Sequence, residues 1–146
     1  MDVNQQIAQF TEWYGPGNDG NCPTGSQWTR ILNRSPEQPL TLINFFKFRG
    51  KAAYEDKTPE VSGQQAFSDY AAVSLPAMQR AGGKFLFVGP YQGMFLGDDE
   101  DWDLVAIGAY PNLKSFMALY SDDHYRRAFH HRTAACERQK VMICGE

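Results

Sequence analysis

Hydrophobic residues recur along the chain with two different periods, and the change between them predicts the order of the secondary-structure elements. Residues 40–48 are apolar in the manner of a strand, whereas the apolar residues of 63–81 recur every three or four positions, which indicates a helix ending at Gly82 and Gly83. Further along, the patterns predict a long strand with a break near Gly89, a returning strand, a short helix, a longer helix and a final strand, over residues 84–96, 102–110, 111–120, 122–138 and 140–144. This β-α-β-β-α-β order predicts an α+β domain with a ferredoxin-like sheet.

A shorter amphipathic segment precedes this series. Four of its apolar residues share one helical face, namely Val3, Ile7, Phe10 and Tyr14, and the pattern stops at the Gly-Pro-Gly sequence of residues 15–17. A capping-box pair, Thr24 and Gln27, then predicts a second short helix. We therefore expect residues 1–39 to form an N-terminal helical arm whose aromatic side chains pack on a main domain of residues 40–146.

Neither face of the predicted sheet is polar. In the strand of residues 102–110, one set of alternating positions carries Leu104 and Ala106, and the other carries Val105 and Ile107. Because the helices of such a domain cover only one face of the sheet, the second face needs another cover. We expect a second copy of the chain to supply it, so that two sheets form a homodimeric α+β barrel. In the alternative, the N-terminal arm covers the second face within a monomer.

Composition and charge narrow the class of protein. A chain of 146 residues with 42% hydrophobic residues is long enough for one globular domain with a single core. The net charge of −3 offers no basic surface for nucleic acid or for an anionic membrane. No apolar stretch approaches the ~20 residues of a membrane-spanning helix, and the first ten residues do not resemble a signal peptide. We therefore expect a cytoplasmic protein with no nucleic-acid or membrane partner.

The sequence indicates neither a metal nor a cofactor. The three cysteines, Cys22, Cys136 and Cys144, are odd in number and lack the CxxC spacing of a zinc site, so free buried thiols are expected. The acidic run of residues 98–101 lacks the glycine and the terminal glutamate of a calcium loop, so a solvated hairpin is the favoured interpretation. The glycine clusters do not have the spacing of a phosphate-binding fingerprint.

A permanent charge lies on the apolar face of the predicted last helix. Arg132 shares a helical stripe with five apolar residues: Tyr125, Ala128, Phe129, Ala135 and Cys136. A buried guanidinium needs oxygen atoms around its donors to offset its desolvation. Asp103 shares a strand face with Val105 and Ile107 and is the obvious partner. We expect an Asp103–Arg132 ion pair, and the alternative is an anion-binding pocket around Arg132.

Further polar residues are expected to face the same interior. With aromatic walls from Phe46, Phe48 and Phe87 they outline a small-molecule pocket, and the candidate ligand-binding residues are Asn44, Phe48, Tyr70, Trp102, Asp103 and Arg132. For Asn44, a structural amide with satisfied hydrogen bonds is the favoured alternative. For Tyr70, a phenol at the edge of the core is an equal alternative.

Two residues are candidates for proton transfer. Tyr70 carries a hydroxyl on the inward face of the helix over residues 63–81, and the ordinary pKa range of His131 suits a general acid or base. His130 lies about 100° around the helix from His131, and His124 lies two turns away, which disfavours a histidine metal site. We interpret both as solvent-exposed helix residues.

Several motifs of the chain occur in the same order in one known family. They are Leu42-Ile43-Asn44-Phe45-Phe46-Lys47-Phe48-Arg49 followed by Ala53-Tyr54, then Phe67 and Tyr70 with Pro76 and Gly82-Gly83, then Trp102-Asp103 through Tyr110-Pro111, and last Tyr125 with His131-Arg132 and Ala134-Ala135. The ordered set resembles the domain of unknown function 1330 family over residues 40 to about 144. The resemblance implies a dimeric α+β barrel, the fold shared with antibiotic-synthesis monooxygenases, muconolactone isomerase and haem-degrading enzymes. It implies no particular reaction.

Three functional classes follow from these residues. The first is a small-molecule-binding protein that takes an aromatic or carboxylate metabolite through Arg132. The second is an enzyme on the same pocket, in which His131 or Tyr70 moves a proton, as in an isomerase or a cofactor-free monooxygenase. The third is a non-catalytic dimeric binding or scaffolding module whose interior polar groups only stabilise the fold.

Overall fold

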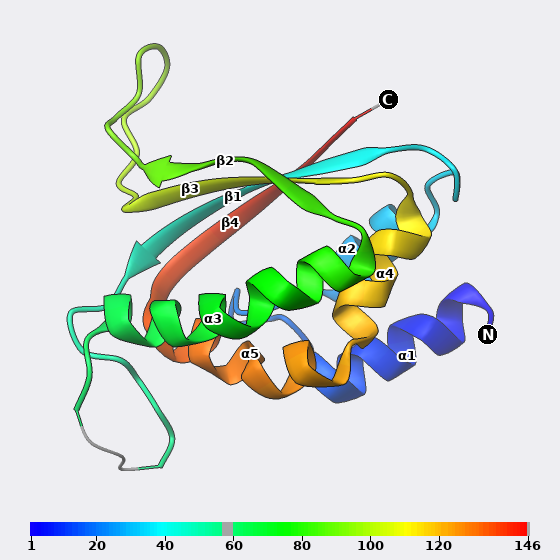
Figure 1. The fold of residues 1–146 in the computed structure, drawn as a ribbon, viewed down its shortest axis with the longest axis horizontal. Coiled ribbons are helices and arrows are strands. Elements are labelled where there is room, and N and C mark those ends of the chain that lie inside the picture. The colour runs from blue at the N-terminus through cyan, green and yellow to red at the C-terminus, as the bar shows by residue number, and fades with distance from the viewer. Residues whose placement is uncertain (57–59, 146) are drawn as a thin grey trace.

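Five helices and four strands make up the structure, a computed structural model that describes residues 1–56 and 60–145 (Figure 1). In chain order they are α1 (Val3–Tyr14), α2 (Gly25–Leu32), β1 (Leu40–Phe48), α3 (Gly63–Ala81), β2 (Lys84–Pro90), β3 (Leu104–Tyr110), α4 (Leu113–Ser121), α5 (Asp123–Ala135) and β4 (Cys136–Gly145). The strands form one antiparallel sheet in the order β2-β3-β1-β4. This is the ferredoxin-like arrangement, so the predicted α+β class and strand order are confirmed.

The helices all lie on one side of the sheet (Figure 1). On this side, which we call the helix face, Leu40, Leu42 and Phe46 of β1 are buried against the helices. The largest core cluster joins Leu40 and Leu42 to the apolar stripes of α3, α4 and α5, and Phe46 belongs to a smaller cluster. The sheet therefore has one covered face, as alternation along β1 requires.

The N-terminal arm packs on the helices and not on the sheet's second face. Phe10 of α1 stacks on Trp28 of α2 with ring centroids 4.4 Å apart, and Tyr14 meets Tyr120 of α4 edge-on at 5.2 Å. The hydroxyl of Tyr14 also donates a hydrogen bond of 2.6 Å to the carbonyl oxygen of Tyr120. The arm therefore packs its aromatic residues on the body, as expected, but the alternative in which it covers the second face of the sheet is wrong.

The second face of the sheet, which we call the outer face, is apolar and carries no helix within the described residues (Figure 1). The strand register brings its side chains together, because directly paired residues of antiparallel strands point the same way. The apolar residues of the outer face are Ile43, Phe45, Phe87, Val105, Ile107 and Met142, and the polar residues Thr41 and Lys140 lie on the same face. Phe87 and Met142 are 51% and 40% exposed. An apolar surface of this kind is typical of an interaction surface.

The strand predicted over residues 84–96 is shorter than expected. β2 ends at Pro90, and residues 91–103 leave the sheet as a loop whose apolar tip includes the fully exposed Phe95. A proline has no N–H to continue the ladder, and the next residue, Tyr91, donates its N–H to the carbonyl oxygen of Asp103 and so closes the loop. Consequently β3 begins at Leu104 and not at residue 102.

The last helix is also shorter than predicted, and the last strand is longer. α5 ends at Ala135 because its final carbonyl oxygens accept hydrogen bonds from outside the helix: Arg49 N–H donates to Ala135 and Ala53 N–H donates to Ala134. Cys136 is already extended, and β4 follows without a turn. The predicted boundaries of 138 for the helix and 140 for the strand are therefore wrong.

A glycine permits the close approach of α3 to α5. A Cβ atom at Gly63, the first residue of α3, would clash with the backbone oxygens of Arg49 and Ala135. The absence of a side chain lets the start of α3 sit against the end of α5, and these two helices carry Tyr70 and Arg132. The pairing of the two helices thus positions the candidate site.

Two further expectations concern the chain as a whole. Across the described residues, the helices are too short or too polar for any of them to cross a membrane. The three cysteines are free, with Cys136 buried and the other two, Cys22 and Cys144, partly exposed. The expectation of free thiols is confirmed, although only one of them is fully buried.

Candidate ligand-binding site

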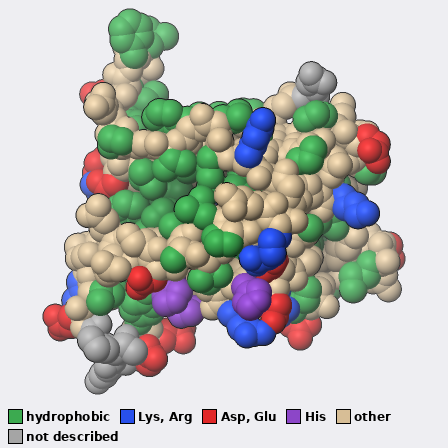
Figure 2. Space-filling model, in the orientation of Figure 1, with side chains coloured by type: hydrophobic (Ala, Val, Ile, Leu, Met, Phe, Trp, Pro, Cys, Tyr) green, Lys and Arg blue, Asp and Glu red, His purple; other side chains and the backbone are tan. Residues whose placement is uncertain are grey.

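A cavity of about 270 Å³ lies between the helix face of the sheet and α3, and we call it the α3 cavity. Its walls are mostly aromatic and aliphatic side chains from the sheet and from α3, among them Phe46, Phe67, Met78, Phe85, Val88 and Leu104. Figure 2 shows hydrophobic side chains gathered on this side of the molecule, over β2 and α3. A concave apolar site of this size suits a small organic molecule.

Polar groups converge at the inner end of the α3 cavity. Arg132 of α5, Tyr70 of α3 and Asn44 of β1 all line it, and Tyr125 lies beside them. Arg132 is 6% exposed and Tyr125 is 1% exposed, so these groups are shielded from solvent. The burial of Arg132 that the helical stripe predicts is therefore confirmed.

The Arg132 guanidinium has three hydrogen bonds, all to uncharged groups. Its Nε donates to Oε1 of Gln139 at 2.8 Å, its Nη1 donates to the hydroxyl of Tyr70 at 3.1 Å, and its Nη2 reaches Oδ1 of Asn44 at 3.5 Å. Among the residues that the structure describes, no carboxylate lies within salt-bridge distance of it. A guanidinium has five N–H donors, so these bonds leave donors for a ligand.

Aromatic rings surround the same cation. The guanidinium carbon of Arg132 lies 4.9 Å from the ring centroid of Phe46 and 5.5 Å from that of Phe129. Cation–π contacts of this kind stabilise a buried charge by about 2 kcal/mol, which is less than the several kcal/mol that burial of an ion costs. Arginine does not lose its proton under these conditions. The site therefore holds a positive charge that is only partly compensated.

Two tyrosine hydroxyls extend this polar group. The hydroxyl oxygens of Tyr70 and Tyr125 are 2.6 Å apart. Burial raises the pKa of Tyr125 well above its usual value, so this hydroxyl stays protonated and remains a donor. Since the Tyr70 oxygen accepts from Arg132, the chain Tyr125–Tyr70–Arg132 links two donors and one cation at the end of the cavity.

Asn44 is tied to the sheet by its own amide. Its Nδ2 donates to the carbonyl oxygens of Ala106 at 3.0 Å and Leu42 at 3.4 Å, and its Oδ1 faces Arg132. The favoured sequence interpretation, a satisfied structural amide, agrees with these bonds. Because Asn44 also lines the cavity, it acts as an orienting group for the guanidinium.

The predicted ion pair between Asp103 and Arg132 is wrong. Asp103 lies one residue before β3, where its carboxylate accepts the backbone N–H of Phe48 at 2.7 Å and lies 3.6 Å from Nζ of Lys47. The end of β1 leaves that N–H without a strand partner, and the carboxylate supplies one. Asp103 therefore stabilises the edge of the β1–β3 pair and does not contribute to the α3 cavity.

Three aromatic residues of the predicted pocket also lie elsewhere. Trp102 packs with Phe45 at 5.7 Å and donates its Nε1–H to Glu100, which places it on the outer face. Phe87 is directly paired with Ile107 and lies on the outer face as well. Phe48 packs on Phe67 at 5.0 Å in a smaller cluster beside the α3 cavity and does not line it.

His131 lies outside the α3 cavity. It is partly exposed on α5, and its Nδ1 is 2.6 Å from the hydroxyl of Tyr54. Burial lowers the pKa of His131, and the neighbouring His130 lowers it further. The structure thus does not place His131 beside Tyr70 and Arg132. His124 and His130 are exposed, as the sequence indicates.

Replacing His131 with glutamine should leave ligand binding in the α3 cavity unchanged. The same change should reduce the loss of stability on acidification, because the folded state holds the His131 pKa below its unfolded value. The contribution of His131 to the free energy of unfolding is then fully present above about pH 6.5. It is lost as the pH falls through the pKa of His131 in the folded state. Thermal melts of both proteins across that range, with and without ligand, test both parts. A change in ligand affinity in the variant would contradict the placement of His131.

Several residues of the site were not singled out from the sequence. Gln139 was missed because the last helix was extended to residue 138, although the alternation of Gln139, Val141 and Ile143 indicates a strand face. Phe85 lines the cavity in the place predicted for Phe87, because β2 contains a register shift between the two residues that turns Phe87 to the outer face. The alternation in the sequence does not reveal that shift.

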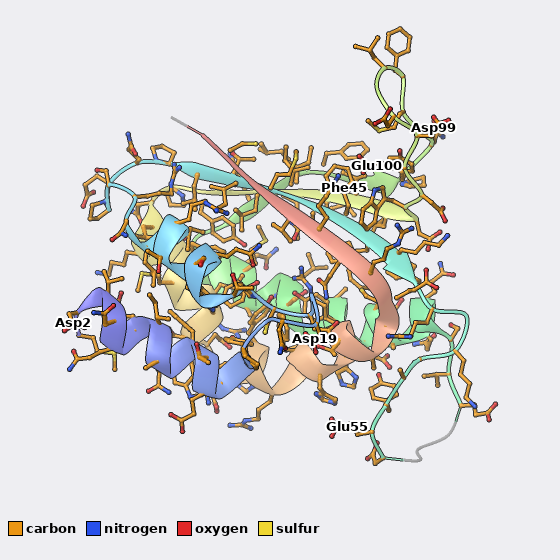
Figure 3. All side chains as sticks on the ribbon, turned by 180° about the vertical axis from the view of Figure 1, so that it is seen from behind. Asp2, Asp19, Phe45, Glu55, Asp99 and Glu100 are labelled. Atoms are coloured by element: carbon orange, nitrogen blue, oxygen red, sulfur yellow. The ribbon has the colours of Figure 1, made fainter. Side chains whose placement is uncertain are left out.

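The acidic run of residues 98–101 is ion-paired in part. Glu100 lies 2.6 Å from Lys140, and Asp101 lies 3.1 Å from Lys47. Figure 3 shows Glu100 near Phe45 at this end of the sheet, with Asp99 further along the loop. In the part of the chain that the structure describes, no three His, Cys, Asp or Glu residues are grouped to hold a metal ion. These two ion pairs connect the loop to β4 and β1.

Comparison with solved structures finds one similar protein in two crystal structures. RPA0582, a protein of unknown function from Rhodopseudomonas palustris, matches in two crystal structures, one of the methylated protein. Both are 32% identical in sequence and cover 86% of this chain, and the match spans 93% and 95% of their own chains with TM-scores of 0.79 and 0.78. A protein of unknown function from Bacteroides fragilis, described as dimeric and ferredoxin-like, matches with 15% identity and a TM-score of 0.40 over 77% of this chain and 100% of its own.

Comparison with known sequences gives one family. No curated protein matches the chain. Residues 53–145 match the family described as "Domain of unknown function (DUF1330)", so the matched range excludes β1, which carries the first-strand motif, and also excludes the N-terminal arm. The match spans most of the main domain and includes the helices that carry Tyr70 and Arg132. The chain therefore belongs to the DUF1330 family of domains of unknown function.

Proposed function

We propose that this protein binds a small organic acid with an apolar body in the α3 cavity. The observation that carries the proposal is the fully buried Arg132, which has no carboxylate partner among the described residues and lies at the inner end of an apolar cavity. A ligand carboxylate would supply the missing negative charge, and its two oxygens match the paired donors of a guanidinium. The aromatic walls would hold the rest of the molecule.

The polar groups favour an anion over a neutral ligand. Tyr125 remains a donor, and Arg132 can only donate, so the inner end of the cavity offers a ligand mainly hydrogen-bond donors. A carboxylate accepts from such groups without needing an acceptor in return. A ligand ammonium group would lie beside the guanidinium, which carries the same charge. Like charges at this distance in a buried site cost several kcal/mol, so such a ligand is disfavoured.

The matched pair of phenylacetate and phenylacetamide tests the proposal, since the two molecules share a ring and differ in charge. Phenylacetate should raise the melting temperature and phenylacetamide should not. Replacing Tyr70 with phenylalanine should weaken phenylacetate by about tenfold, the effect of removing one hydrogen bond to a charged group. Calorimetric titration measures the affinities.

Tyr54→Phe is the matched control for that variant. It removes a tyrosine hydroxyl bonded to His131, outside the cavity, and should leave phenylacetate affinity unchanged. If phenylacetate and phenylacetamide behave alike, the charge on Arg132 does not select the ligand, and the third functional class, a non-catalytic scaffolding module, is favoured.

Proton transfer at the same site is the second candidate function. It is supported by the 2.6 Å contact between the hydroxyls of Tyr70 and Tyr125 next to Arg132, because a phenol beside a cation can give a proton to a substrate oxygen and the guanidinium can stabilise an enolate. Isomerase-like and cofactor-free oxygenase-like chemistry both use such an enolate. In this scheme Tyr70 is the acid in place of His131, and Tyr70→Phe would abolish turnover while ligand binding is weakened by only about tenfold.

We also propose a homodimer in which the outer faces of two copies pack together. The proposal is supported by the apolar outer face, which includes Ile43, Phe45 and Ile107 and carries no helix within the described residues, although Trp102 lies against Phe45 at one end. A self-complementary apolar surface is best covered by a second copy related by twofold symmetry. The two sheets would then form the α+β barrel predicted from the sequence.

A further inference from the structure

A second cavity, of about 380 Å³, lies on the other side of Arg132. It is enclosed by the segment between α1 and α2, by α2 itself and by β4, and we call it the arm cavity. The residues that line it include Cys22, Trp28, Ile31, Gln139, Val141 and Ile143. Figure 3 shows the α1–α2 segment, marked by Asp19, on the helix side of the sheet. The match to the DUF1330 family, over residues 53–145, does not include the arm.

Arg132 lines both cavities. Tyr120, Phe116 and Leu42 are also shared, so these four side chains form the partition between the two spaces. The Nε of Arg132 bonds to Gln139 on the β4 side, whereas Nη1 bonds to Tyr70 on the α3 side. The charge of one guanidinium therefore acts on two separate compartments.

Two residues that line the arm cavity each carry a donor with no hydrogen-bond partner among the described residues. These donors are Nε1 of Trp28 and Nε2 of Gln139, and both atoms are buried. Trp28 itself is only 1% exposed. Buried N–H groups without an acceptor are rare and cost about 1–3 kcal/mol each, so each needs an explanation. Trp102 offers a contrast, because its indole N–H is satisfied by Glu100.

The lining of the arm cavity has donors and positive charge but no acid. Arg132 lies at its inner wall and Arg30 contributes at its rim, and no described aspartate or glutamate lines it. The rim also includes polar groups of Asn21, Thr24 and Gln27. An oxygen-bearing anion would satisfy the Trp28 and Gln139 donors and would meet the Arg132 charge, and the polar rim suits a molecule with a second charged end.

We propose that the arm cavity is a second ligand site, which takes a small polar carboxylate such as a short dicarboxylic acid. One carboxylate accepts from Trp28 Nε1 and Gln139 Nε2 beside Arg132, and the other end of the molecule lies at the rim near Arg30. The site differs from the α3 cavity in its occupant, because the α3 cavity has an apolar mouth. The N-terminal arm therefore builds a binding site in addition to extending the core.

Nuclear magnetic resonance of the tryptophan side chains tests the proposal with succinate as the probe. The chain has three tryptophans, so a ¹⁵N-labelled sample gives three indole N–H signals, which Trp13→Phe and Trp102→Phe assign by elimination. Succinate should shift the Trp28 signal in a saturable way as its N–H gains an acceptor. The Trp102 signal should stay in place, because that N–H already has its partner in Glu100.

Trp28→Phe is the matched variant, since it keeps a ring in contact with Phe10 and removes the N–H. It should weaken succinate by about tenfold, the effect of one hydrogen bond to a charged group, and leave phenylacetate affinity in the α3 cavity unchanged. The wild-type titration decides the matter even if this variant does not fold. A Trp28 signal that stays still throughout the succinate titration overturns the proposal, as does equal succinate affinity in the folded variant. Phenylacetate binding is measured separately. Absence of phenylacetate binding contradicts the proposed function, whereas absence of a Trp28 shift with succinate contradicts only the second site.

Discussion

Methionine in place of Arg132 should reduce phenylacetate affinity by on the order of 100-fold, because a buried hydrogen-bonded charge pair contributes about 2–5 kcal/mol. The linear side chain of methionine fills much of the same space and can pack on Phe46 and Phe129, which now surround the guanidinium. The variant should therefore still fold. The substitution removes the cost of burying a charge, but it leaves Oε1 of Gln139 and Oδ1 of Asn44 without this donor, so a lower melting temperature is also expected. Melting curves with and without phenylacetate measure both effects at once.

Arg127→Met serves as the matched control. Arg127 lies on the same helix as Arg132, but it is exposed and pairs with Asp123 at the surface. Its replacement should change the melting temperature by only a small amount, and it should not change the response to phenylacetate. If Arg132→Met melts at a lower temperature and yet responds to phenylacetate like the wild type, the guanidinium has a structural role only and the proposed carboxylate site is wrong.

Aspartate in place of Ile43 should convert the proposed homodimer into a monomer. Ile43 is at the centre of the outer face, directly paired with Ile107 on β3 and with Met142 on β4. Twofold symmetry would bring two such carboxylates into one apolar interface, where each unpaired charge costs several kcal/mol. The dissociation constant should rise by more than about 1,000-fold. Light scattering coupled to size-exclusion chromatography reports the mass of each species.

The same substitution at an exposed helix position provides the comparison. Ala72 lies on the solvent side of α3, away from the outer face, and Ala72→Asp should remain dimeric. Circular dichroism of Ile43→Asp should match that of the wild type, since the outer face makes no contact with the helices. A wild-type protein that is monomeric at micromolar concentration would contradict the homodimer without any variant.

The strand order, the helices and the burial of Arg132 could be predicted because each depends on local periodicity. The stripe of α5 that contains Arg132 also contains Tyr125 and Phe129, and all three are buried. A period of 3.6 residues specifies which side chains share a face, and a core helix has only one face to bury. The arm was predictable in the same way from its capping box and its aromatic residues.

The partners of Arg132 could not be predicted, because they depend on where neighbouring segments enter the sheet. The alternation predicts Asp103 as part of β3, but the strand begins at Leu104. The Asp103 carboxylate accepts a hydrogen bond from the N–H of Phe48 instead. Trp102 departs from the same alternation and lies on the outer face. Gln139 becomes a partner only because α5 stops at Ala135. A shift of a few residues at each boundary decides the chemistry of the site.

The contact between Tyr14 and Tyr120 joins residues that are 106 positions apart in the chain. The central strand β1 likewise pairs with β3 and β4, which are made much later. During synthesis on the ribosome, Tyr14 of the arm therefore has no partner on the body of the protein until α4 and α5 have emerged from the exit tunnel. Contacts at such long sequence separation slow folding, and an incomplete chain with exposed apolar segments is prone to aggregate. Nascent chains of this protein should thus depend on chaperones until the last strand is in place.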